Sequence, residues 1–264
     1  MMSRTLRLSD GLSVRVIEAG AGEPLLLIHG VGMRAEAWAP QIAVLAADTC
    51  VIAVDLPGHG ESDPLPGQPQ LTDYVAWAAR VIQALDLGPV SVAGHSMGSL
   101  IVGGLAVERP ELVRRAALLN GVHRRSAQAR DAVLARATEI ATGAGRIEEP
   151  LARWFGPEET AKRDEVAGWL RNVSLAGYAA AYGAFAEGDT AYANRLGEIR
   201  CPLLVLTGDG DANSTADMAR AMADMAPQGR AVIVEGHRHM VNLTAPDAVN
   251  AELQRWLATK EIAA

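Results

Sequence analysis

The chain has 264 residues, of which 49% are hydrophobic and 21% are charged, and its formal net charge is −7 at pH 7. This composition is that of a globular protein, and the length suits one large domain or a core domain with an insertion. Nucleic-acid binding requires clustered Lys and Arg side chains, and this acidic chain has no evident basic face. We therefore expect no nucleic-acid partner.

The beginning of the chain carries no targeting signal. Residues 1–5 lack the apolar core of a signal peptide, and no run of about 18 apolar residues follows. The sequence therefore predicts a cytoplasmic protein without a membrane partner. Cys50 and Cys201 each precede an apolar run and are expected to be buried, reduced thiols. No spacing of His and Cys is typical of a metal site, so we expect neither a metal nor a cofactor.

Apolar runs alternate with helical stretches along most of the chain. Residues 5–8 and 13–19 alternate apolar and polar side chains around Asp10-Gly11, which predicts an antiparallel hairpin. Unbroken apolar runs, typical of strands in a parallel sheet, occupy residues 25–28, 51–54, 90–93, 116–119, 203–206 and 231–234. Helices are predicted at residues 38–46, 71–85, 99–108, 214–225 and 246–258. This order predicts an α/β fold with a mostly parallel, eight-stranded sheet flanked by helices.

One interval interrupts this order. Roughly 80 residues separate two strands that a single helix could join, and a structureless loop of that length is improbable in a compact domain. The interval is rich in Ala, Glu, Arg and aromatic residues. We therefore predict a core domain from residues 1–120 and 201–264, with residues 121–200 inserted as a helical cap above the sheet.

The most informative segment is the G-x-S-x-G sequence at residues 94–98. A β-prone run precedes it, and an apolar run rich in small residues follows it. A strand, a sharp turn and a helix would place the Ser96 hydroxyl at the tip of the turn, at a helix N-terminus. Gly94 and Gly98 would keep this turn free of Cβ atoms that crowd it.

Other reactive residues follow predicted strands, at the edge of an open α/β sheet where ligands bind. The segment His29-Gly30-Val31-Gly32 follows residues 25–28, and Asp211 follows residues 203–206. Two histidines, His237 and His239, follow residues 231–234. The candidate nucleophile, acid and base thus occur in the order serine, aspartate, histidine.

The whole chain resembles the α/β-hydrolase superfamily. The motifs that carry the resemblance are His29-Gly30-x-Gly32, DLPGHGES at residues 55–62, GHSMG at residues 94–98, Gly208-x-x-Asp211 and HMVNL at residues 239–243. The resemblance implies that Ser96 is the nucleophile, that His239 is its general base and that Asp211 orients the imidazole. It further implies an oxyanion hole made by the backbone N–H groups of Val31 and Met97.

Two of these assignments have a competitor nearby. Asp209 competes with Asp211, but the family pattern places the acid three residues after the glycine of its motif. His237 competes with His239, and only His239 is followed by an apolar residue as the pattern requires. Asn120 ends a predicted strand where some family members carry their acid, but an amide cannot supply the charge.

The cap indicates a substrate class. Residues 153–155 and 177–189 resemble the cap of 3-oxoadipate enol-lactonases and related small-ester hydrolases, although aromatic residues at helical spacing also suit packing alone. The resemblance implies a cofactor-free serine hydrolase that cleaves a small ester or lactone, including carboxylate-bearing ones, through an acyl-serine intermediate. We expect a monomer or homodimer. The candidate substrate-binding residues are His29, Arg34, His123, Arg124 and Trp154, with bracing of the oxyanion loop as the alternative role of His29. Arg125 and Arg153 are further candidates for binding a substrate carboxylate.

Three alternatives remain open at this point. A C–C bond hydrolase acting on a ring-cleavage product and a cofactor-free haloperoxidase use the same three residues. A non-catalytic small-molecule receptor on the same fold is the alternative outside the enzymes. Haloalkane dehalogenation is disfavoured because it uses an aspartate at the position of Ser96.

Overall fold

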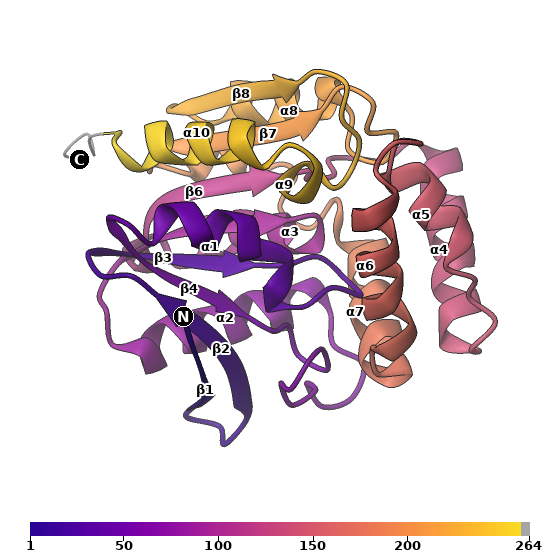
Figure 1. Cartoon of the computed structure of the whole chain (residues 1–264), viewed down its shortest axis with the longest axis horizontal. Helices are drawn as coiled ribbons and strands as arrows, with labels where there is room; N and C mark the ends of the chain where they lie inside the picture. The colour runs from indigo at the N-terminus through magenta and orange to yellow at the C-terminus, as the bar shows by residue number, and fades with distance from the viewer. Residues whose placement is uncertain (260–264) are drawn as a thin grey trace.

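The computed structural model describes residues 1–259, in which eight strands form one sheet between two layers of helices (Figure 1). The strand order is β1-β2-β4-β3-β5-β6-β7-β8. The strands are β1 (Met2–Arg7), β2 (Ser13–Ala19), β3 (Glu23–Ile28), β4 (Thr49–Val54), β5 (Val90–His95), β6 (Val113–Leu119), β7 (Leu203–Gly208) and β8 (Gly229–Val234). Among the described strands, only the pairs of β2 with β1 and with β4 are antiparallel. The predicted hairpin and mostly parallel sheet are therefore confirmed.

Apolar side chains form a core on each face of the sheet. The unbroken apolar runs of β3 to β7 are buried, as expected for strands covered on both faces. Strand β8 differs from the expectation, because most of its residues are only partly buried. It is the last strand of the sheet and pairs only with β7, so one edge remains uncovered.

Helices cover both faces of the sheet (Figure 1). Those of the core are α1 (Ala39–Leu45), α2 (Leu71–Leu85), α3 (Met97–Glu108), α8 (Ala216–Met225), α9 (Val241–Thr244) and α10 (Pro246–Leu257). Three short 3-10 helices are η1 (Ala35–Trp38), η2 (Pro110–Leu112) and η3 (Leu196–Glu198). Helix α3 begins at Met97, two residues earlier than expected, because the chain turns into the helix directly after Ser96. Within residues 1–259, no helix is both long and apolar enough to cross a membrane.

Four helices are inserted between β6 and β7: α4 (Ala127–Ala141), α5 (Glu148–Trp154), α6 (Thr160–Asn172) and α7 (Leu175–Gly188). Figure 1 shows them side by side at the end of the sheet to which the parallel strands point. They contact the loops that follow β3 and β4. A Cβ on Gly32 would lie 2.5 Å from Leu170, and one on Gly58 would lie 2.6 Å from the backbone of Gly177. The inserted helices therefore pack on the carboxyl-terminal edge of the sheet.

Candidate active site

Ser96 occupies a sharp turn between β5 and α3. Its φ of 53° and ψ of −114° are unusual for a residue with a side chain, and such conformations cost on the order of 1–3 kcal/mol. The turn closes so tightly that a Cβ on Gly94 would lie 2.0 Å from the carbonyl oxygen of Gly98. A Cβ on Gly98 would lie 2.2 Å from the carbonyl oxygen of Ile28. These close contacts leave no room for a Cβ atom at either position, which explains why glycines lie on both sides of the strained Ser96.

Asp211 and His239 lie together at the ends of β7 and β8. The His239 Nδ1 atom is 2.7 Å from Asp211 Oδ2, and each residue is only 3% exposed. The other carboxylate oxygen accepts hydrogen bonds from the backbone N–H groups of Asn213 and Ser214, at 2.8 and 3.1 Å. Burial alone would raise the pKa of the Asp211 carboxyl, but the adjacent imidazole and these hydrogen bonds lower it. Asp211 is therefore held as a carboxylate that orients the ring of His239.

Asn120 also belongs to this cluster, through contacts that the sequence pattern did not predict. Its side-chain amide donates hydrogen bonds to Asp211 Oδ2 at 2.8 Å and to Thr207 Oγ1 at 3.1 Å. Its backbone has a φ of 49°, a left-handed conformation that asparagine tolerates better than most residues. The feature of the sequence that indicates this contact is a polar residue directly after a buried strand.

Two aromatic rings flank His239. The ring of Trp154, at the end of α5, is stacked on it with centroids 5.8 Å apart and an interplanar angle of 30°. On another side, the His95 ring lies 5.1 Å from it, and His95 Nε2 is 2.8 Å from the His239 carbonyl oxygen. His95 is the first x of the G-x-S-x-G sequence and directly precedes Ser96. This hydrogen bond therefore joins the turn that carries Ser96 to the loop that carries His239.

The neighbouring Arg238 joins the histidine loop to the inserted helices. Its Nη1 atom donates to the carbonyl oxygens of Ala152 and Phe155, each at 2.8 Å. The Arg238 carbonyl oxygen in turn accepts from the Asn120 amide at 3.3 Å. The end of α5 is therefore attached to the segment that carries His239.

The two competing residues have other partners. Asp209 is exposed and accepts a hydrogen bond from the backbone N–H of Gly236 at 2.9 Å. His237 lies 2.9 Å from the hydroxyl of Thr244 and 3.5 Å from the carboxylate of Glu159. Neither forms the pair that Asp211 and His239 form.

Two backbone N–H groups lie beside Ser96 without a protein partner. Across residues 1–259, no hydrogen bond engages the N–H of Val31 or of Met97. Met97 begins α3, where the N–H groups of the first turn have no acceptor within the helix. Val31 follows Gly30, and a Cβ on Gly30 would lie 3.0 Å from the Ser96 Cβ. Both donors are thus available for negative charge that develops near Ser96.

The histidines and the tryptophan suggested as substrate contacts have different environments. His29 is 1% exposed, and the backbone of Leu56 and Gly30 engages both ring nitrogens, which leaves neither for a ligand. Trp154 lies against His239. His123 is nearly buried and lines a pocket with Asp189. Burial and then the nearby Arg124 lower the pKa of His123.

The suggested arginines all have partners within the chain. Arg34 pairs with Glu36 at 2.6 Å, and Arg124 donates a hydrogen bond to the side chain of Asn194. Arg125 forms a buried ion pair with Asp189 at 3.3 Å, and Arg153 forms an exposed ion pair with Glu149 at 3.6 Å. Across the described part of the chain, no cluster of three or more His, Cys, Asp and Glu side chains could hold a metal ion.

The chain belongs to the alpha/beta hydrolase family, whose profile matches residues 25–252. It is 52% identical to (E)-2-((N-methylformamido)methylene)succinate hydrolase from Acinetobacter baylyi, over 98% of this chain and 99% of that protein. The enol-lactonase from Burkholderia xenovorans has a similar structure, with a TM-score of 0.89, 22% identity and coverage of 97% of this chain and 100% of that one. A thermophilic esterase from Thermogutta terrifontis has a TM-score of 0.87, 24% identity and coverage of 97% and 98%. The predicted fold and superfamily are therefore confirmed.

Proposed function

We propose that this chain is a serine hydrolase in which Ser96, His239 and Asp211 form the catalytic triad. The observation that carries the proposal is the buried hydrogen bond of 2.7 Å between Asp211 and His239. The His239 carbonyl oxygen lies 2.8 Å from the ring of His95, the residue before the serine in the strained turn. A serine hydroxyl is a weak nucleophile and needs an oriented base to take its proton. The alternative is a non-catalytic small-molecule receptor on the same fold. A receptor would not need an ionised Asp211 with hydrogen bonds to both carboxylate oxygens.

The proposed reaction has two steps. Ser96 Oγ attacks the acyl carbon while His239 accepts the hydroxyl proton and then delivers it to the leaving group. Water next attacks the acyl-Ser96 intermediate, with His239 again as the base, and the free acid leaves. In each step the negative oxygen accepts hydrogen bonds from Val31 and Met97, and losing one such donor costs about 2.7–4 kcal/mol.

We assign residues 121–200 as a cap over this site. The position of α4 to α7 at the end of the sheet supports this assignment, as does the stacking of Trp154 on His239. The packing of α6 and α7 against Gly32 and Gly58 supports it as well. A lid at this place would shape the substrate pocket above Ser96.

The proposed substrate is a small acyl compound that carries carboxylates. The relative at 52% identity is named for a succinate derivative with an N-methylformamido group, which has two carboxylates and an acyl C–N bond. This name extends the ester or lactone expected from the sequence to an amide. Identity over nearly the whole of both chains supports a shared substrate class.

Hydrolysis of a carbon–carbon bond is the second candidate. The compound for which that relative is named favours it, because protonation of its enamide carbon gives an iminium carbon that water can attack before the neighbouring carbon–carbon bond breaks. The two candidates yield different products. Acyl hydrolysis of the named compound releases formate and leaves an enamine, which water converts to methylamine and an aldehyde whose neighbouring carboxylate is readily lost as CO₂. Direct hydrolysis of a carbon–carbon bond leaves the formyl group on nitrogen.

The test is turnover of a substrate panel by the wild-type chain and by Ser96→Ala, with products identified by NMR. The panel contains (E)-2-((N-methylformamido)methylene)succinate, a carboxylated enol-lactone, 4-nitrophenyl acetate and a vinylogous 1,5-diketone. Ser96-dependent release of the acyl acid, which is formate for the succinate derivative, supports the proposal. A carbon–carbon cleavage product in which the formyl group is still bound to nitrogen, or cleavage of the diketone alone, supports C–C hydrolysis. Equal turnover by Ser96→Ala would contradict the triad. No turnover of any compound, although a fluorophosphonate labels Ser96, would favour a receptor.

A further inference from the structure

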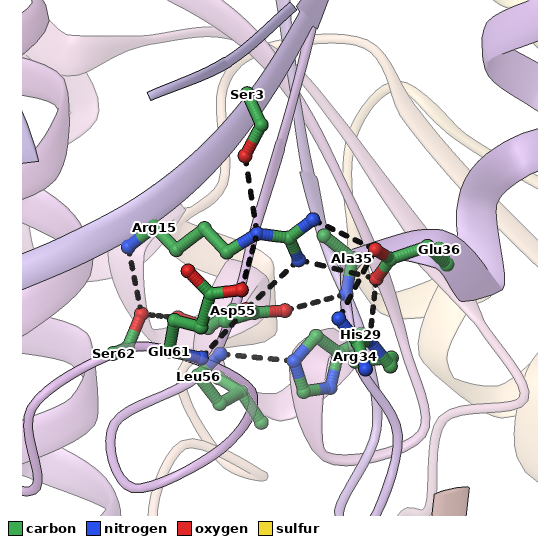
Figure 2. Close-up of polar contacts among 10 residues, drawn as sticks. All are labelled: Ser3, Arg15, His29, Arg34, Ala35, Glu36, Asp55, Leu56, Glu61 and Ser62. Atoms are coloured by element: carbon green, nitrogen blue, oxygen red, sulfur yellow. Dashed lines mark hydrogen bonds and ion pairs between the residues drawn. The ribbon is translucent and has the colours of Figure 1, made fainter. Parts of the chain in front are cut away.

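Two histidines outside the proposed triad join the loops that follow the neighbouring strands β3 and β4. Each histidine lies on one loop and accepts a hydrogen bond from the backbone of the other. His29 on the first loop accepts a hydrogen bond at Nε2 from the N–H of Leu56 on the second loop, at 2.9 Å (Figure 2). His59 on the second loop accepts one at Nε2 from the N–H of Gly32 on the first, at 3.0 Å. Both side chains are buried, and the rings are 5.5 Å apart. The two loops therefore hold each other through one histidine each.

The hydrogen bonds determine which ring nitrogen carries the proton. A backbone N–H only donates, so Nε2 of each histidine must be the acceptor, and the proton lies on Nδ1. His29 Nδ1 can then donate to the Gly30 carbonyl oxygen at 2.7 Å, and His59 Nδ1 to the Pro57 carbonyl oxygen at 3.0 Å. Burial lowers the pKa of both rings, for His59 to about 3, so both are neutral near pH 7.

These contacts fix the two peptide groups on either side of Val31. In a trans peptide the C=O and N–H groups point in opposite directions. The Gly30 carbonyl points to His29 and also accepts from the Met33 N–H at 3.2 Å, so the Val31 N–H of that same peptide points away from His29. The next peptide is fixed by its Gly32 N–H, which points to His59. Rotation of either peptide would break a buried hydrogen bond.

A cluster of charges anchors the rest of the same loop (Figure 2). Asp55 Oδ1 accepts from the Ala35 N–H at 2.7 Å, and Asp55 Oδ2 is 3.2 Å from Arg15 Nη1. Arg15 also pairs with Glu36 at 2.7 Å, and Glu36 pairs with Arg34. The segment from Gly30 to Glu36 is thus attached to the loop after β4 at Gly32 and at Ala35, and to β2 through Arg15 and Glu36. Within the described residues, the Val31 N–H has no hydrogen-bond partner.

We propose that His29 and His59 are positioning residues that keep the Gly30–Val31 peptide with its N–H directed to the oxyanion site beside Ser96. This inference rests on the proposed function, because it assigns Val31 as an oxyanion donor. Neither histidine touches the substrate; each acts through the backbone. Their removal should therefore weaken binding of a tetrahedral adduct and slow turnover, while ground-state binding of substrate changes little.

The experiment compares His29→Leu with His29→Asn, which keeps an N–H donor at the position of Nδ1. It compares His59→Leu with His59→Gln, which keeps an acceptor at the position of Nε2. For each variant, kcat and KM are measured with 4-nitrophenyl acetate, and an inhibition constant is measured with an alkyl trifluoromethyl ketone, whose adduct with Ser96 carries an oxyanion. Val113→Ala, a buried position at the other end of the sheet, is the control for a general loss of stability.

Both leucine variants should lower kcat at least tenfold, which is below the roughly hundredfold or greater loss expected when an oxyanion donor is removed altogether. The inhibition constant of the ketone should rise by a similar factor, with KM within about threefold of wild type. The conservative variants His29→Asn and His59→Gln should recover most of both losses. Leucine variants with a lower Tm but unchanged kcat and ketone affinity would overturn the inference, since that result is expected of a structural role alone.

The outcomes separate this inference from the function on which it rests. Full activity of Ser96→Ala would contradict the proposed function. Loss of activity in Ser96→Ala, together with full activity and ketone affinity in His29→Leu, contradicts only the positioning role. If a leucine variant does not fold, the conservative pair decides: His29→Asn and His59→Gln must retain ketone affinity, and a tenfold loss in either one contradicts the proposal.

Discussion

The side-chain amide of Asn120 lies 2.8 Å from Asp211 Oδ2, the same oxygen that is 2.7 Å from His239 Nδ1. This oxygen therefore faces two donors, one from the ring and one from a residue that ends the neighbouring strand. Asn120 holds the carboxylate in the position from which it can orient the imidazole. The asparagine at this place therefore supports the Asp211 carboxylate by a hydrogen bond.

Replacing Asn120 by glycine should slow the reaction. Glycine removes the amide but keeps the left-handed backbone that Asn120 adopts. A hydrogen bond to a charged group contributes about 1.5–3 kcal/mol, so kcat should fall roughly tenfold to hundredfold with little change in KM. Steady-state kinetics check this. Unchanged kcat in Asn120→Gly would show that Asp211 needs no support from Asn120.

Asp211→Asn should lower kcat by about 10³–10⁴, because an amide no longer stabilises the imidazolium and favours the wrong tautomer of His239. Asp209→Asn is the matched control, since Asp209 is exposed and bonds only a backbone N–H. We expect its kcat to stay within about threefold of wild type. A large loss in the Asp209 variant with a small loss in the Asp211 variant would reverse the assignment.

Arg238→Met should detach the end of α5 from the histidine loop. The substitution keeps much of the side-chain volume but removes both hydrogen bonds to the carbonyls of Ala152 and Phe155. Because Trp154 would then lose its fixed place on His239, we expect kcat to fall about threefold to tenfold. Arg230→Met is the control, an exposed arginine paired with Glu252. Equal kinetics in the two variants would show that this attachment does not position His239.

Stability should decrease as the pH falls below about 6.5, the ordinary pKa of histidine. Burial, and then a neighbouring histidine, lower the pKa of His59 and of His95, each to about 3. Between these values the unfolded chain binds protons that the folded chain does not, so each ring lowers the free energy of unfolding by up to about 1.4 kcal/mol per pH unit. Urea titrations from pH 7 to pH 4 measure this. The slope should be shallower in His59→Gln, and an unchanged slope would contradict the burial of a neutral His59.

The sequence predicted the sheet and the turn at Ser96 because both depend on local patterns. Apolar runs of four residues mark buried strands, and the G-x-S-x-G sequence specifies its own turn. The β8 run has the same local character, yet its residues are only partly buried. The position of a strand within the sheet depends on the whole topology, which a run of four apolar residues does not encode.

The contacts around the site could not be predicted in the same way. The side chain of Trp154 reaches His239 across 85 positions of sequence, and His95 reaches it across 144. His29 was expected among the substrate contacts, but its ring is used to hold Leu56 and Gly30. Each of these contacts requires two loops to meet in space, and neither loop carries a pattern that identifies its partner.

Covalent labelling tests the central claim most directly, namely that Ser96 is a nucleophile activated by His239. The wild-type chain and the variants Ser96→Ala and His239→Ala are treated with a fluorophosphonate, and labelled peptides are identified by mass spectrometry. We predict one adduct on Ser96 in the wild type, none at that position in Ser96→Ala, and labelling at least about a hundredfold slower in His239→Ala. Equal labelling of Ser96 with and without His239, or an adduct only on another residue, would contradict the account.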